Sequence, residues 1–136
     1  MYANFVLTRT EPCADGAGEI ELGTYSSGLI IVPAYPAMLE FAGLIQLAFE
    51  EDDRSGIYEV ELRGTDLEAF DTHVMQVWTV DVPDPDDGWK RPRTTTILVP
   101  MRDIAVFGDL DMALDVEVDR CWAARQTILV RRLSVP

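Results

Sequence analysis

The sequence predicts an all-β fold, a single antiparallel β-sandwich of about eight strands with at most one short helix near residues 34–45. In the segments 57–64 and 111–119, apolar and polar residues alternate with a period of two, which is typical of a strand with one buried face. β-Branched and aromatic residues recur along the chain, and turn-forming residues separate the apolar runs. The pattern offers no long helices to connect parallel strands.

The expected strands follow one another with short turns between them. They are 2–8, 20–25, 29–32, about 40–50, 57–64, 74–82, 94–101 and 111–119, followed by the last strand of the closing hairpin. The strand 74–82 has apolar residues on both faces, which predicts a core strand with Trp78 in the interior. In 111–119, by contrast, the acidic residues are expected on a face in water.

One segment, 36–51, allows two interpretations. Met38, Phe41 and Ile45 fall on one face of a helix that Pro36 could begin,. Gly43 weakens that helix, and the alternation towards residue 49 suits a strand. We favour a short helical turn near 34–39 and then a strand from about 40 to 50, with a helix as the alternative.

The closing hairpin permits a prediction of register. Buried faces match if Val118 lies opposite Ala124, Leu114 opposite Ile128 and Met112 opposite Val130,. On the other face, Glu117 would then meet Arg125, and Asp111 would meet Arg131. A register that places Val116 opposite Arg125 would contradict this prediction.

Length and charge restrict the class of protein. With 136 residues and 48% hydrophobic residues, the chain is expected to form one globular domain over 1–136,. The net charge of −13 disfavours nucleic acid and anionic membranes as partners,. Because no signal segment is recognisable, we expect a cytoplasmic protein in which Cys13 and Cys121 are reduced thiols.

Motifs for catalysis and for cofactors are missing from the sequence, so we expect neither enzymatic activity nor a cofactor. The single histidine, His73, has no neighbouring nucleophile motif,. Oxygen ligands for calcium could come from Asp84, Asp86 and Asp87, but their spacing does not fit an EF-hand, so this metal site is only a weak candidate. The acidic run 50–53 is interpreted as a solvated turn.

Aromatic residues in turns give the candidates for partner binding, because tryptophan often anchors protein interfaces. Trp89 lies in a proline-rich loop beside Lys90 and Arg91, and Trp122 lies near the tip of the last hairpin. We expect these four residues to contact a partner.

The order of elements resembles a family of small bacterial proteins that is known as a domain of unknown function and looks like an immunoglobulin-type β-sandwich. The resemblance is carried by 3–7, 33–36, 56–62, 98–100, and Gly108 followed by 114–119. The usual glycine of the last turn is replaced by the residues 120–122. The resemblance implies an immunoglobulin-like fold and supplies no catalytic residues.

Together these features predict a non-enzymatic β-sandwich that acts as a protein-interaction or structural module, encoded by a bacterial host or a phage. It would bind a protein partner or form a homo-oligomer. The alternative is a small-ligand binder or enzyme with a pocket that contains acidic residues and His73. These two interpretations differ in whether His73 and carboxylates converge in a cavity.

Overall fold

The computed structural model describes residues 1–8, 13–14, 20–21, 28–85 and 93–134. Strands make up most of these residues, and none of them forms a helix. The strands are β1 (Tyr2–Thr8), β2 (Cys13–Ala14), β3 (Ile20–Glu21), β4 (Leu29–Val32), β5 (Ala37–Phe49), β6 (Gly56–Asp66), β7 (Asp71–Val82), β8 (Arg93–Val106), β9 (Leu110–Val118) and β10 (Cys121–Arg132). No helix in the described part of the chain could therefore cross a membrane.

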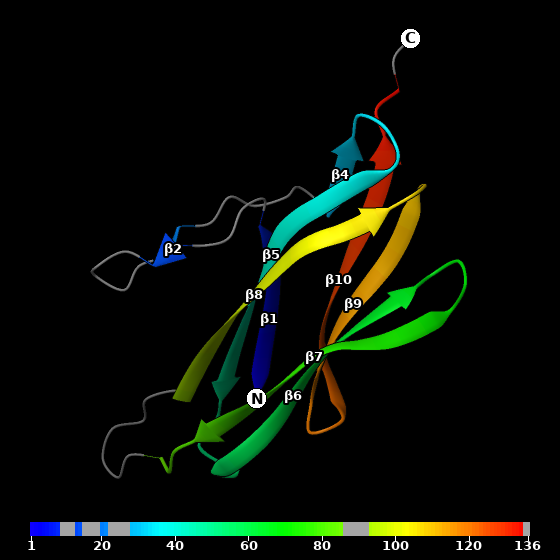
Figure 1. The fold of residues 1–136 in the computed structure, drawn as a ribbon. Helices are drawn as coiled ribbons and strands as arrows, with labels where there is room; N and C mark the ends of the chain where they lie inside the picture. The colour runs from blue at the N-terminus through cyan, green and yellow to red at the C-terminus, as the bar shows by residue number, and fades with distance from the viewer. Residues whose placement is uncertain (9–12, 15–19, 22–27, 86–92, 135–136) are drawn as a thin grey trace.

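Eight of these strands form two sheets, and β2 and β3 form a separate pair (Figure 1). The three-stranded sheet has the order β1-β5-β8, and the five-stranded sheet has the order β4-β10-β9-β6-β7. All neighbouring strands are antiparallel except β4 and β10, which are parallel. The expectation of a purely antiparallel fold is therefore wrong for this pair.

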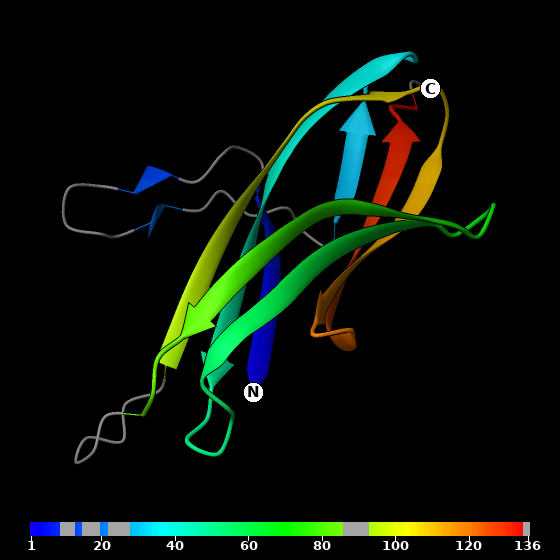
Figure 2. The ribbon, with the colours of Figure 1, turned by 60° about the horizontal axis from the view of Figure 1, so that its bottom comes forward.

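The two sheets enclose one hydrophobic core, and Figure 2 shows them as separate layers. The largest fully buried side chains come from both: Phe41, Ile45, Leu47, Phe49 and Val99 from the three-stranded sheet, and Val60, Leu62, Leu114, Val116, Ile128 and Val130 from the five-stranded sheet. The amide of Gln126 on β10 also donates a hydrogen bond to the carbonyl oxygen of Phe5 on β1, 2.7 Å away. Burial of these side chains provides the main stabilisation of the fold.

The short helix expected near 34–45 does not form. Residues 33–36 are bends, and β5 runs from Ala37 to Phe49 as one strand. As the central strand, β5 pairs with β1 on one side and with β8 on the other. Apolar side chains are buried on both of its faces, so they also satisfy a helical period, which is why the sequence pattern alone was ambiguous.

The closing hairpin has a different register from the predicted one. Met112 lies opposite Ile128, and Arg125 lies opposite Asp115, a shift of two residues from the expectation. The turn is tighter than expected, because Asp119 and Arg120 alone form it, with φ of 47° and 66°,. From Ala124 onward the shift by two keeps each side chain on its face, so the buried faces there were predicted correctly,. Between Trp122 and Ala124 a bulge shifts the register once more and places Trp122 opposite Glu117, on the other face,.

The strand β7 is an edge strand and not a core strand. Val80 and Val82 are buried, and Trp78 packs partly against the core, but Val74 and Val77 are each 51% exposed. Apolar residues on both faces of this strand therefore do not reflect burial on both faces.

Candidate interaction face

We call the side of the five-stranded sheet that points away from the three-stranded sheet the outer face. Large hydrophobic side chains are exposed on this face at both margins and on β10. They are Leu29 and Ile31 on β4, Trp122 on β10, Ile57 on β6, and Val74 and Val77 on β7. In β4 and β6 the neighbouring residues point into the core, which fixes the outward direction of Leu29, Ile31 and Ile57,. The other three lie opposite outward-facing residues, since Val77 pairs with Glu61, Val74 with Arg63 and Trp122 with Glu117. An exposed group of this kind marks surfaces that bind other macromolecules.

Trp122 lies at the beginning of β10, opposite Glu117 on β9. Its side chain is 62% exposed. The indole Nε1–H donates a hydrogen bond of 2.9 Å to Oδ1 of Asp115. Because its only polar atom has a partner inside the protein, the exposed part of the ring is entirely apolar.

Asp115 holds this arrangement in place. Its Oδ1 also accepts a hydrogen bond of 2.7 Å from Nε of Arg125, and its Oδ2 accepts one of 3.1 Å from Nη2. This bidentate pair raises the pKa of the Arg125 guanidinium above its ordinary value, mainly through the hydrogen bond,. Asp115 is only 9% exposed, because Arg125 and Trp122 lie over it. The expectation that the acidic side chains of this strand lie in water is wrong at this position.

The hairpin turn beside Trp122 is fixed to β6. Oδ1 of Asp119 accepts a hydrogen bond of 2.8 Å from the backbone N–H of Glu59, and Oδ2 accepts one from the guanidinium of Arg54. The hydrogen bond from Glu59 and then the neighbouring Arg54 lower the pKa of the Asp119 carboxyl,. Trp122 therefore follows a turn whose position is fixed by the contacts of Asp119 with Glu59 and Arg54.

Ion pairs cover the centre of the outer face. Arg63 on β6 contacts both Glu61 and Glu117 at 2.9 Å. Arg131 on β10 contacts Asp111 at 2.6 Å, as predicted, although these two residues are not directly opposite each other. The predicted pair of Glu117 with Arg125 is replaced by Asp115 with Arg125. Counted together, these four carboxylates and three guanidinium groups have a net charge of 3 − 4 = −1.

Three of the four predicted contact residues, Trp89, Lys90 and Arg91, lie outside the described residues, as do Asp86 and Asp87. Trp122 is the one that the structure places. His73 is exposed on β7, where it pairs with Gly64. Sequence reasoning missed Asp115, because the carboxylate that orients Trp122 looks like any other acidic residue in an alternating strand.

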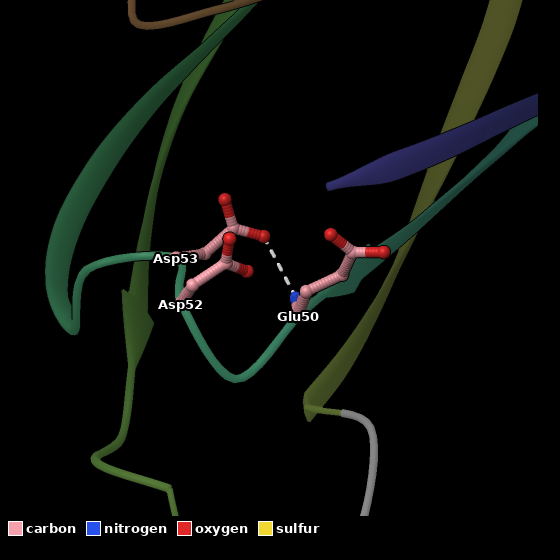
Figure 3. Close-up of side chains that lie close together, drawn as sticks. All are labelled: Glu50, Asp52 and Asp53. Carbon is pink, nitrogen blue, oxygen red and sulfur yellow. Dashed lines mark hydrogen bonds between the residues drawn. The ribbon is translucent and has the colours of Figure 1, made fainter.

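The acidic turn after β5 is held by internal donors. Carboxylate oxygens of Glu50, Asp52 and Asp53 lie within 4.8 Å of one another (Figure 3). Oδ2 of Asp53 accepts hydrogen bonds from the backbone N–H of Glu50 at 2.7 Å and lies 2.9 Å from the amino group of Met1. The first of these contacts and then the amino group lower the pKa of Asp53. Asp84, of the weak calcium candidate, accepts a hydrogen bond from Ser55.

Because Asp53 already has two internal donors and Asp84 accepts a hydrogen bond from Ser55, we expect calcium to stabilise the protein little. The melting temperature in millimolar calcium should differ by less than about 2 °C from that in excess EDTA. Magnesium at the same concentration controls for general ionic effects. A calcium-specific increase of several degrees would contradict this interpretation and would identify one of the acidic turns as a metal site.

Two shallow grooves are lined by described residues. One, of about 390 Å³, lies over the ends of β1, β5 and β8, where Tyr2, Asn4, Gln46, Ala48, Thr94 and Thr96 line it. The other, of about 160 Å³, lies between β7 and β8 beside Met75 and Met101. His73 lines neither groove, and neither contains a pair of carboxylates. These two grooves therefore do not match the expected acidic pocket of an enzyme.

Comparison with known proteins assigns neither a family nor a function. A scan against protein-family models finds no match, and a search of curated proteins finds no similar sequence. The outer face itself is therefore the feature from which a function can be inferred.

Proposed function

We propose that this protein is a non-enzymatic interaction or assembly module that binds another protein chain through its outer face. The observation that carries the proposal is Trp122, an exposed ring whose orientation is fixed by Asp115. Tryptophan side chains contribute more than most others to interface energies. A ring that is already held in one position loses little conformational entropy on binding.

We also propose that the two sheets form a single immunoglobulin-like sandwich. The support is the common core between the sheets and the resemblance to small bacterial sandwich proteins. Sandwiches of this kind present binding surfaces on sheet faces as well as on loops. A cytoplasmic location would suit this function.

Photo-crosslinking in the source cells tests the proposed function. We expect benzoylphenylalanine at Val77, on the outer face, to form covalent adducts with a protein chain. The same group at Met38, which is 62% exposed on β5 of the other sheet, should not. Replacing Trp122 with alanine should reduce the adduct at Val77 about tenfold or more, because loss of an anchoring tryptophan typically costs 2 kcal/mol or more.

Equal adducts at Val77 and Met38, or a yield at Val77 that does not depend on Trp122, would contradict the outer face as the binding surface. The Trp122→Phe variant keeps most of the apolar ring but not the N–H group. It should retain part of the yield, which separates the apolar contact from the role of the hydrogen bond to Asp115.

A further inference from the structure

Two methionine sulfur atoms lie over Gly64 on β6. A β-carbon at this glycine would be 2.9 Å from Sδ of Met75 and 3.4 Å from Sδ of Met112. The two sulfur atoms are therefore at most about 6.3 Å apart, which is the sum of these two distances. Gly64 is buried and continues the core-facing row of Val60 and Leu62. Its missing side chain thus leaves a recess that both sulfur atoms share.

Met75 reaches this recess from the edge strand β7 because of a bulge. The ladder pairs Leu62 with Gln76 and Arg63 with Val74, so Met75 is the extra residue between them. A bulge changes the direction of a side chain relative to strict alternation, and bulges are frequent next to functional sites. Met75 is also 36% exposed. A small ion can therefore reach its sulfur atom from solvent.

His73 lies beside the two sulfur atoms. It is directly opposite Gly64 in the ladder of β6 and β7, and residues in such a pair point to the same side of the sheet. The β-carbons of opposite residues are about 4.5–5.5 Å apart, a distance that an imidazole ring can span. The side chain of His73 is exposed. The surroundings of Gly64 thus combine two thioethers with one imidazole.

The type of these ligand atoms selects the kind of ion. Thioether sulfur is a soft, uncharged ligand that favours Cu(I), and imidazole also binds copper. Calcium and magnesium require oxygen ligands, and zinc is bound by thiolate, imidazole or carboxylate groups. We propose that Met75, Met112 and His73 form a binding site for Cu(I). The site lies on the core-facing side of the sheet and is independent of the proposed function of the outer face.

The two methionine side chains can close around one ion by rotation. Two sulfur ligands of a tetrahedral metal lie about 3.8 Å apart when the metal–sulfur bonds are about 2.3 Å long. Methionine is unbranched and has three rotatable bonds, so its sulfur atom adjusts readily. The hollow of about 160 Å³ between β7 and β8 is lined by Met75 and by a further thioether, that of Met101. It gives the Met75 side chain room to move.

The charge of the surroundings favours a cation. The whole chain carries −13, which raises the local concentration of cations. Asp66 lies opposite both Asp71 and Met112 in the ladders, so two carboxylate residues adjoin the site. Arg102, which also lines the hollow, forms an ion pair with Glu40. Because the three ligands are neutral, the bound ion keeps its charge of +1, and the neighbouring carboxylates offset it.

NMR spectra of the methionine methyl groups test the site in the full chain. Ag(I) is the probe, because it shares the ligand preference of Cu(I) and is not oxidised in air. Cysteine thiolates also bind such ions, so the measurement uses the Cys13→Ser/Cys121→Ser variant. We expect one equivalent of Ag(I) to shift the methyl signals of Met75 and Met112. The signal of Met38, which is 62% exposed on β5, should not move.

Competition with a coloured Cu(I) chelator under anaerobic conditions measures the affinity of the same thiol-free chain. We expect one Cu(I) per chain, an affinity at least about tenfold lower for Met75→Leu and for His73→Gln, and no binding by Met75→Leu/Met112→Leu. Met38→Leu is the matched control and should bind like the thiol-free chain. Leucine for methionine nearly conserves volume, and circular dichroism and urea unfolding show whether each variant folds.

Two results would overturn the site. One is a set of methyl signals in which Met75 and Met112 stay in place, or move no more than Met38, at one to ten equivalents of Ag(I). This result needs no substitution of a ligand, so it does not depend on whether the variants fold. The other is an equal affinity for Cu(I) of the thiol-free chain and of Met75→Leu/Met112→Leu.

Discussion

Replacing Gly28 with alanine is expected to destabilise the protein by about 3 kcal/mol, or roughly 10 °C in melting temperature. Gly28 precedes β4 and has a φ of 67°, which disfavours any side chain,. A β-carbon at this position would lie 2.0 Å from the carbonyl oxygen of Thr127. Relief of that clash requires movement of β4 away from β10. This movement would disturb the hydrogen bond of 3.0 Å that the backbone N–H of Leu129 on β10 donates to the carbonyl oxygen of Gly28.

Urea unfolding measures this effect, and Gly108→Ala is the matched control. A β-carbon at Gly108 has no heavy atom within 4 Å and its φ is not positive. We expect its unfolding free energy to change by less than about 0.5 kcal/mol, or to rise slightly because alanine restricts the unfolded chain. Similar midpoints for the two variants would show that β4 accommodates the added methyl group.

The second large effect is expected for Arg93→Met, which should lower the free energy of unfolding by about 3 kcal/mol. Arg93 begins β8 and is only 9% exposed. Its guanidinium donates to the carbonyl oxygens of Pro83 at 2.8 Å, of Asp53 at 2.7 Å, and of Glu50. It thus joins the turn after β5 to the segment after β7. Hydrogen bonds from a charged donor contribute about 1.5–3 kcal/mol each, and the three are not additive.

Lysine at position 93 keeps the charge but not the planar fork, so it should recover about half of the lost free energy. Arg102→Met serves as the control, because Arg102 is exposed, unlike Arg93, and its ion pair with Glu40 is 3.7 Å long. An exposed pair of this kind contributes less than about 1 kcal/mol. If Arg93→Met and Arg102→Met unfold at the same urea concentration, Arg93 does not connect these segments in the way the structure indicates.

The proposed function and these stability effects concern different parts of the molecule. Gly28 and Arg93 decide whether the sheets are assembled, whereas Trp122 and Val77 point outward and can be changed with little effect on the core. The outer-face variants can therefore be tested for association in a folded protein. Gly28→Ala is less suitable for that purpose, because β4 also carries Leu29 and Ile31 of the outer face.

The candidate site could be predicted from the sequence only in part. Trp122 was expected as a contact residue because a tryptophan near a hairpin tip is often exposed. Its hydrogen bond to Asp115 could not be predicted, since it depends on the tight turn at Asp119 and Arg120 and on the bulge between Trp122 and Ala124. The position of β7 at an edge, which exposes Val74 and Val77, was also not visible in a strand with apolar residues on both faces.

The amino-acid sequence by itself determined the all-β class, the approximate strand segments and the buried faces of β6, β9 and β10. These features follow from local alternation and β-propensity, which each segment carries within its own residues. Only the tertiary structure decided the strand order, the parallel pairing of β4 with β10, and the strand conformation of residues 37–49. These depend on which distant segments pair, and pairing is set by the combined burial of all strands and not by the pattern of any one of them.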